Sequence, residues 1–312
     1  MTIDERREAL LAKLTENPDK IDAVPGDLYA NIAMAHLVTG TNLSAADASI
    51  RHTAEWFEHP HPLGRRHDGA CAFAALKLTR LSFLTPLHDK LSCATQDAIR
   101  EFFLTRDFAS RHGSENHALI FRTARHLMGS AMPDRVFRAY GRTGADLARE
   151  DRDWLESFIG YRARFGWGEF DSPCYMGPDF ECLINLHDFS PDPVLRRLSG
   201  MMLNCLLADM LVDSLDNGYG GAHGRIYARH AFDHTLENTR QMFCYYFGTL
   251  PPAEVNAHIM IDILTSGFRP HPAVHALATN RRGTYENRER AHLHNPRDIQ
   301  PQRPMHASIR KY

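Results

Sequence analysis

Apolar residues along this chain recur mostly every three to four positions, which is the spacing of one face of an α-helix. The clearest case is the segment 191–216, whose apolar stripe includes Val194, Leu198, Met201 and Cys205. Strand signals are weak, because β-branched runs are few and no Asn-Gly hairpin lies between alternating segments. The pattern therefore predicts an all-α protein. Further helices are predicted over residues 5–14, 27–39, 45–58, 69–84, 91–104, 115–128, 144–164, 179–187, 230–248 and 253–267.

Short polar residues mark where several of these helices should begin or end. Ser44, Ser114 and Ser190 each precede a predicted helix, and their hydroxyl groups are expected to cap its N-terminus. Asn217 and Gly218 follow the longest apolar stripe and are expected to end that helix.

The number of predicted helices and the short loops between them favour antiparallel helical hairpins. No short repeat recurs at a fixed period, so we expect an irregular curved array, an (α/α) toroid, over residues 1–268. Residues 269–312 contain five prolines, many Arg and His, and little apolar periodicity. They are expected to form an extended, polar C-terminal arm or linker that wraps the toroid or mediates association.

Composition narrows the classes of partner. The chain has 36 Lys and Arg against 38 Asp and Glu, a net charge of -2, which gives no general attraction for nucleic acid. No apolar run approaches the ~18 residues of a membrane span, and the N-terminus lacks the apolar core of a signal peptide. We expect a soluble, cytoplasmic protein that binds no membrane. The six cysteines are scattered without a CxxC pair, so buried free thiols are expected and no metal or cofactor site is predicted.

Three segments gather polar side chains where helices should start. In the first, Glu115 suits the positive end of the predicted helix dipole. Asn116 and His117 follow it, and their amide and imidazole groups offer donors at a helix N-terminus, where anions bind readily.

The second segment, residues 165–175, holds two glycines, a proline and four aromatic residues. One interpretation is a structural loop anchored by Trp167 and its aromatic neighbours. The other is a platform for a sugar ring that carries the acid–base groups Glu169, Asp171 and Tyr175.

The third segment, residues 217–227, contains four glycines, which allow the backbone to approach a ligand closely. It matches neither the GxGxxG nor the Walker pattern. His223, Arg225 and Tyr227 add an imidazole, a fixed cation and a phenol to this turn.

In their order along the chain, the three segments resemble the toroid domain of the polysaccharide lyase superfamily, which includes chondroitin AC and hyaluronate lyases and heparinase II/III-like proteins. Those families place an Asn, often followed by His, at a helix start, then a loop with Tyr, then a Gly-Arg segment. The matching positions here are Asn116 with His117, Tyr175, and Gly224 with Arg225.

The resemblance implies β-elimination on a glycan that contains uronic acid, or on a related acidic sugar. Asn116 and His117 are then expected to bind the carboxylate, and Tyr175 to act as base and then as acid. Arg225 is the cation that would help the phenol to ionise, and His223 is a second proton carrier. The expected substrate-binding residues are Trp167, Glu169, Tyr227, Arg122 and Glu115.

Members of this superfamily typically continue into a β-sandwich domain. The resemblance therefore implies a partner β-domain supplied by another chain, or a homo-oligomer formed through the C-terminal arm. An acidic carbohydrate or a small acidic molecule is the expected ligand.

Three other functions fit the residues. A toroid glycoside hydrolase would use two carboxylates, with Glu115 paired with Glu169 or Asp171. A noncatalytic sugar-binding or assembly subunit would need the pocket but no proton carriers. A cytosolic elimination or dehydration enzyme would act on a small metabolite.

Overall fold

The computed structural model describes residues 1–16, 21, 30–56, 68–108, 114–215, 218–220, 223–248, 255, 257–279 and 286. Most of these residues are helical, which confirms the all-α prediction. The helices are α1 (Ile3–Thr15), α3 (Asn31–Thr39), α4 (Leu43–Trp56), α5 (Asp68–Phe83), α6 (Thr85–His88), α7 (Cys93–Thr105), α8 (Glu115–Ala131), α9 (Gly144–Phe165), α10 (Met176–Phe189), α11 (Pro193–Val212), α12 (Ala228–Phe232), α13 (Asn238–Phe247), α14 (Ala257–Leu264) and α15 (Pro272–Thr279), with a 3-10 turn η1 (His234–Leu236).

Two small antiparallel hairpins interrupt the helices. β1 (Val136–Phe137) pairs with β2 (Arg142–Thr143), and β3 (Ser214–Leu215) pairs with β4 (Gly218–Tyr219). The second hairpin takes the place of the last turn predicted for 191–216, since α11 ends at Val212.

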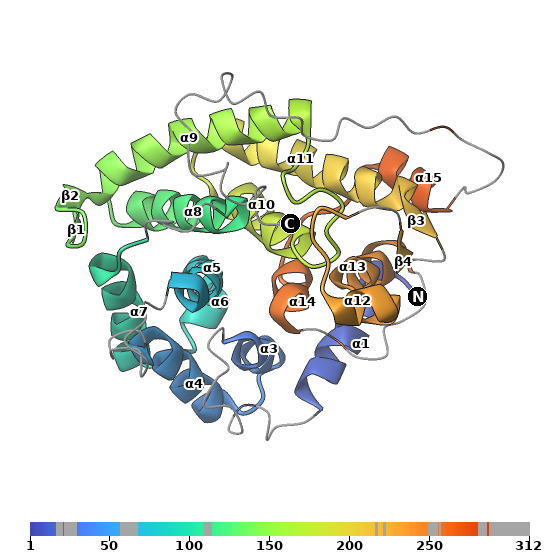
Figure 1. Cartoon of the computed structure of the whole chain (residues 1–312). Coiled ribbons are helices and arrows are strands. Elements are labelled where there is room, and N and C mark those ends of the chain that lie inside the picture. Colours follow the sequence, from blue (N-terminus) through green and yellow to red (C-terminus); the bar gives the residue numbers. More distant parts are fainter. Residues whose placement is uncertain are drawn as a thin grey trace.

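The helices lie in two layers (Figure 1). On one side, α9 and α11 run along the outside and pack against α8 and α10; on the other, α4 packs against α7 and α3. Toward the middle, α5, α8, α10, α14 and α3 contact one another in that order. A continuous apolar cluster fills the space between these layers, and its burial drives the fold.

Three of the predicted caps differ from the structure. Ser44 lies inside α4, which begins one residue earlier. Ser114 occupies the N-cap position of α8, but its hydroxyl bonds the Asn116 side chain instead of a backbone N–H. The cap of α11 is Asp192, whose carboxylate accepts hydrogen bonds from two backbone N–H groups at 2.7 and 3.1 Å. Asp192 is favoured because it immediately precedes a proline in the first helical position.

The predicted helix 230–248 is broken into α12, η1 and α13. Asp233 explains the break, since its carboxylate accepts a hydrogen bond from the backbone N–H of Thr235 at 2.9 Å and so offers the chain a turn in place of a helix. Residues 272–279, assigned above to the extended arm, form α15, which contacts α11 and α13 and buries Val274.

All six cysteines are free, but only four are buried. Cys93 and Cys205 are exposed, so burial is a wrong prediction for these two, which lie on helix surfaces turned away from the core. Within the described ranges, no helix is both long enough and apolar enough to cross a bilayer. Asn217, parts of the predicted helices 27–39, 45–58 and 253–267, and most of residues 280–312 lie outside the described residues.

Candidate functional site

The loop between α9 and α10 is fixed by the first residue of α8. The buried carboxylate of Glu115 accepts hydrogen bonds from the backbone N–H groups of Gly168 at 3.1 Å and Glu169 at 2.6 Å. It also pairs with Arg162 of α9, whose Nη2 lies 2.8 Å away. The Arg162 guanidinium carbon lies 5.9 Å from the ring centre of the buried Trp167. Glu115 and Trp167, both predicted to bind substrate, therefore hold the loop in place.

Glu169 connects this loop to two other segments. Its carboxylate accepts a hydrogen bond from the Asn116 amide at 3.2 Å and from Nη1 of Arg225 at 3.1 Å. Asn116 is fully buried, and the Ser114 hydroxyl donates to its side-chain oxygen. Burial raises the pKa of Glu169, Arg225 acts against that rise, and the Glu115 carboxylate adds to it. The three predicted segments thus meet at one carboxylate, although about fifty residues separate each from the next.

A close backbone contact allows the third segment to pack directly against the second. The N–H of Gly224 donates to the carbonyl of Phe170 at 2.8 Å. A Cβ atom on Gly224 would lie 2.8 Å from the backbone nitrogen of Phe170, which is closer than real Cβ atoms come. Glycine at this position therefore lets the segment that carries Arg225 lie directly against the loop that carries Glu169.

Arg225 in turn supports two tyrosines. Its guanidinium carbon lies 4.1 Å from the Tyr175 ring centre and 5.6 Å from that of Tyr227, which are cation–π distances. The two phenol oxygens are 2.5 Å apart. The cluster therefore fixes both the ring and the hydroxyl of Tyr175.

The ionisation of Tyr175 is opposed by its surroundings. Burial raises the pKa of this phenol, and the hydrogen bond with Tyr227 raises it further. Arg225 favours the phenolate, as the resemblance implies, but its effect is the smaller one. Tyr175 is consequently a neutral phenol at physiological pH.

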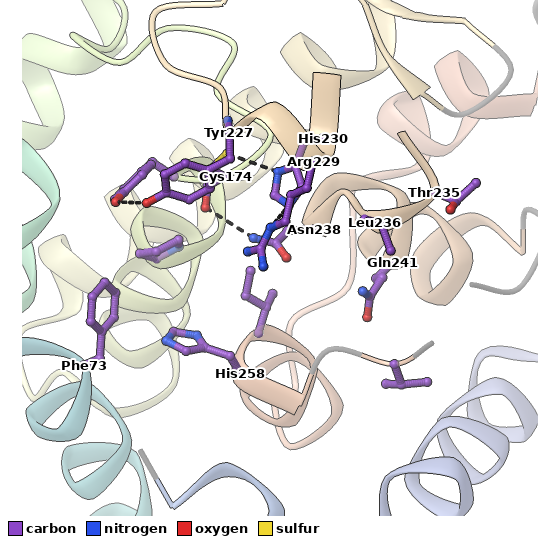
Figure 2. Close-up of a pocket in the computed structure, with 14 residues that line it drawn as sticks. Phe73, Cys174, Tyr227, Arg229, His230, Thr235, Leu236, Asn238, Gln241 and His258 are labelled. Carbon is purple, nitrogen blue, oxygen red and sulfur yellow. Dashed lines mark hydrogen bonds between the residues drawn. The ribbon is translucent and has the colours of Figure 1, made fainter. Parts of the chain in front are cut away.

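Tyr175 and Tyr227 line a pocket of about 560 Å³. Figure 2 shows Tyr227 and other lining residues around it. Arg229, His230 and His258 supply its basic groups, and none of the described residues that line it is Asp or Glu. Such a wall favours an anionic ligand. The lining residues are Phe73, Cys174, Tyr175, Pro178, Tyr227, Arg229, His230, Thr235, Leu236, Asn238, Gln241, Val255, His258 and Ile259.

One wall of the pocket is a chain of hydrogen bonds that ends at a thiol (Figure 2). Arg229 Nε donates to Nε2 of His230 at 3.1 Å, so the neutral ring carries its proton on Nδ1. That Nδ1 lies 3.1 Å from Sγ of Cys174, to which the backbone N–H of Tyr227 also points at 3.4 Å. Burial raises the pKa of Cys174 and lowers that of His230, with Arg229 adding to the second effect. Both groups are therefore neutral at physiological pH.

The opposite wall contains residues that the sequence analysis missed. His258 of α14 lines the pocket, and its Nδ1 lies 3.4 Å from Oε1 of Glu181. Glu181 is fully buried, with Oε2 3.0 Å from Nζ of Lys77. A sequence signal does exist, because both Lys77 and Glu181 lie in largely apolar helical stretches, where a charge has to be buried and paired.

His117 and His223 lie beside the cluster rather than in the pocket lining. The His117 ring centre is 5.8 Å from that of Phe73, which lines the pocket. Nδ1 of His223 contacts the backbone carbonyl of Asp171, and its ring packs edge-on against Tyr219. Asp171 accepts a hydrogen bond from the Tyr219 hydroxyl at 2.9 Å and belongs to this outer group.

Arg122 lies in a different place from the other predicted residues. Its Nη1 pairs with Glu150 at 2.7 Å and with Asp151 at 2.6 Å, and its guanidinium lies over the Trp154 ring at 5.5 Å. These partners belong to α9, so Arg122 joins α8 to α9 and does not line the pocket.

Comparison of the chain with protein-family models, with curated proteins and with solved structures gives no significant match. The functional argument therefore depends on the geometry of the site.

Proposed function

We propose that the two helical layers form an (α/α) toroid and that its pocket catalyses β-elimination on an acidic sugar. The observation that carries this proposal is the neutral phenol of Tyr175, which is fixed by Arg225 and Tyr227 at the wall of a pocket lined by basic and not by acidic described residues. The succession of contacts among the inner helices supports the toroid.

The lining of the pocket suits a carboxylate ligand of the size of a sugar residue. Its volume falls within the ordinary range of small-molecule sites. Arg229 provides a permanent cation, and the amides of Asn238 and Gln241 add neutral donors on the same cavity. A uronic acid combines the negative charge and the hydroxyl groups that such a lining recognises.

Elimination requires three events: the carboxylate is neutralised, the proton next to it is removed, and the leaving oxygen is protonated. Arg229 neutralises the carboxylate and stabilises the charge that develops on it. Tyr175 donates its phenolic proton to the leaving oxygen, since the phenol is protonated before the reaction.

Three of the predicted residues, Asn116, Glu169 and Arg225, act through Tyr175. Asn116 is buried and bonded to Glu169, so we assign it to the positioning chain Asn116–Glu169–Arg225 rather than to direct contact with the carboxylate. This chain holds the Tyr175 ring, and it explains why the three segments converge.

The hydrolase alternative has less support. Two backbone N–H groups and Arg162 already bind the Glu115 carboxylate, and neither Glu115 nor Glu169 is among the residues that line the pocket. A partner β-domain, association through the C-terminal arm and a cytoplasmic location stay predictions.

The test is to offer the protein a panel of uronic-acid polymers and to record ultraviolet absorbance in the band of unsaturated uronates. We expect absorbance to rise with at least one polymer. Arg229→Gln should raise KM at least about tenfold, because it removes the permanent cation. Arg149→Gln is the matched control, since Arg149 is exposed on α9 and pairs only with the neighbouring Asp146 among the described residues. New reducing ends without the absorbance change would favour a hydrolase, and binding without turnover would favour a noncatalytic subunit.

A further inference from the structure

Arg229 is a cation at the pocket that has no acidic partner among the described residues. It belongs to α12, and its exposed side chain lines the pocket. Within the described part of the chain, its guanidinium contacts two neutral groups instead. Nε lies 3.1 Å from Nε2 of His230, and the guanidinium carbon lies 5.7 Å from the ring centre of Tyr227. The charge of Arg229 is therefore left to be balanced by a ligand.

His230 determines which atoms of this guanidinium meet the ligand. A guanidinium pairs with a carboxylate through two parallel N–H groups, either Nε with one Nη or both Nη together. The N–H of Nε already donates to His230, so the first arrangement is occupied. The second, end-on arrangement through Nη1 and Nη2 remains for a carboxylate in the pocket.

The His230 ring is itself held in place. Its Nδ1 lies 3.1 Å from Sγ of the buried Cys174, and the ring packs edge-on against Tyr227 with ring centres 6.0 Å apart. Burial and the charge of Arg229 lower the pKa of His230, so the ring is neutral and Nε2 keeps the lone pair that accepts from Arg229. The order of hydrogen bonds therefore runs from Arg229 through His230 to the thiol.

We propose that His230, held by Cys174, positions the Arg229 guanidinium so that the carboxylate of the ligand binds end-on to Nη1 and Nη2. The inference rests on the proposed function, in which Arg229 neutralises that carboxylate. His230 is then a positioning residue that acts through Arg229. The arrangement selects a planar group with two negatively charged oxygens, because each oxygen receives one N–H of the fork.

End-on pairing also suits the elimination. When the proton next to the carboxylate leaves, negative charge develops on both carboxylate oxygens, and each is stabilised by its own N–H donor. Tyr227 links this site to the proton donor, since its ring contacts Arg229 and its hydroxyl oxygen lies 2.5 Å from that of Tyr175. The group that binds the carboxylate and the group that protonates the leaving oxygen therefore keep a fixed separation.

Nitrogen NMR of the chain labelled with 15N-histidine tests the hydrogen bond without any turnover. We expect His230 to carry its proton on Nδ1, and His230→Gln assigns the signal. Addition of D-glucuronate should leave this tautomer unchanged, because an end-on ligand does not displace Nε from His230. His126, whose ring nitrogens lie 3.0 Å from a backbone carbonyl and 3.1 Å from the Ser190 hydroxyl, is the internal reference. A proton on Nε2, or a tautomer that changes with glucuronate, would overturn the inference.

Calorimetric binding of two small ligands tests the positioning. The unmodified chain should bind D-glucuronate more tightly than the uncharged D-glucuronamide. His230→Leu should reduce this preference about tenfold, because Arg229 loses the acceptor that orients it. His230→Gln should keep most of the preference, since its side-chain oxygen replaces Nε2 as acceptor. His275→Leu, at an exposed position of α15 outside the pocket lining, is the matched control and should change neither affinity.

Three results would overturn the positioning role: no binding of glucuronate by the unmodified chain, an unchanged preference in His230→Leu, or an equal loss of affinity for both ligands. The last result would indicate a merely structural histidine. If His230→Leu does not fold, the tautomer of the unmodified chain and the preference of His230→Gln decide.

The proposed function can fail separately. On any polymer that the unmodified chain converts, His230→Leu should lower kcat/KM about tenfold. An unchanged kcat/KM in that variant refutes the role of His230 while elimination stands. Absence of conversion by the unmodified chain, together with the expected tautomer and the preference for glucuronate, refutes elimination while the carboxylate site stands.

Discussion

The guanidinium carbon of Arg225 lies 4.1 Å from the ring centre of Tyr175, while Nη1 of the same side chain lies 3.1 Å from the carboxylate of Glu169. One side chain thus connects a buried carboxylate to an aromatic ring that faces the pocket. The position of the phenol depends on Arg225, and the position of Arg225 depends on Glu169. Substitution of Glu169 should therefore change the position of the Tyr175 phenol.

Glu169→Gln tests this dependence. The substitution keeps the shape of the side chain but removes the charge that holds Arg225, so we expect kcat to fall about tenfold, an amount equivalent to about 1.4 kcal/mol. The free energy of unfolding should change little, because burial already disfavours this carboxylate. Glu156→Gln, at a half-exposed position of α9 where the carboxylate pairs with Arg152, is the control. Full activity of Glu169→Gln would contradict the role of Glu169 in positioning Tyr175.

Gly224→Ala tests the close contact between the two loops. The added Cβ would meet the backbone of Phe170, so the free energy of unfolding should fall by about 1–3 kcal/mol and turnover should fall with it. Gly160→Ala is the matched control: nothing lies within 4 Å of the added atom, and a helix interior should gain about 0.5–1 kcal/mol. Thermal or urea unfolding of both variants measures the difference. Equal effects of the two changes would contradict the close approach.

The sequence could supply the three segments of this cluster but not the way they meet. Helical periodicity places most helices, and the three polar segments supply Asn116, Glu169, Arg225 and Tyr175, which the folded chain brings into contact. Periodicity could not show that Asn116 faces Glu169 rather than the pocket, because both orientations leave it at the start of the same helix.

The opposite wall illustrates what local patterns miss. His258, Glu181 and Lys77 lie on three helices that are far apart in sequence, and their contacts arise from packing in the core. Each appears in the sequence as a polar or charged residue within a largely apolar stretch. Such a residue indicates a buried partner without identifying it, so the network is visible only in the folded chain.

Arg122 tests whether a residue outside the pocket lining contributes to substrate binding. In the structure it joins α8 to α9 through Glu150 and Asp151, at a partly exposed position. Arg122→Gln should therefore lower the free energy of unfolding by about 1 kcal/mol, as expected for a hydrogen-bonded ion pair near the surface, and leave KM and kcat unchanged. Chemical denaturation and the absorbance assay measure the two effects. A large rise in KM would contradict this assignment and indicate that Arg122 binds the substrate.

The raised pKa of Asp209 predicts that the free energy of unfolding depends on pH. Burial, together with the charges of Asp171 and Asp213, raises the pKa of Asp209 to about 7. The native state then binds a proton that the unfolded chain releases at lower pH, so this group lowers stability as pH rises from about 4 to about 7. Asp209→Asn should stabilise the chain at pH 8 by roughly 1–3 kcal/mol, allowing for solvent screening, and have little effect at pH 4.

The control for this change is Asp134→Asn, at an exposed position. Unfolding curves at several pH values compare the two variants. A gain in stability for Asp209→Asn that is the same at pH 4 and pH 8 would contradict the assignment to a titrating carboxylate.

The most direct test of the account is the turnover of Tyr175→Phe on a uronic-acid polymer that the unmodified chain converts, followed by absorbance of the unsaturated product. The change keeps the ring over Arg225 and removes the proton that the leaving oxygen requires, so kcat should fall at least about 100-fold, while the folded structure persists. Tyr161→Phe, a tyrosine beside Arg162 that does not line the pocket, should leave kcat unchanged. Full turnover by Tyr175→Phe would contradict elimination through this phenol.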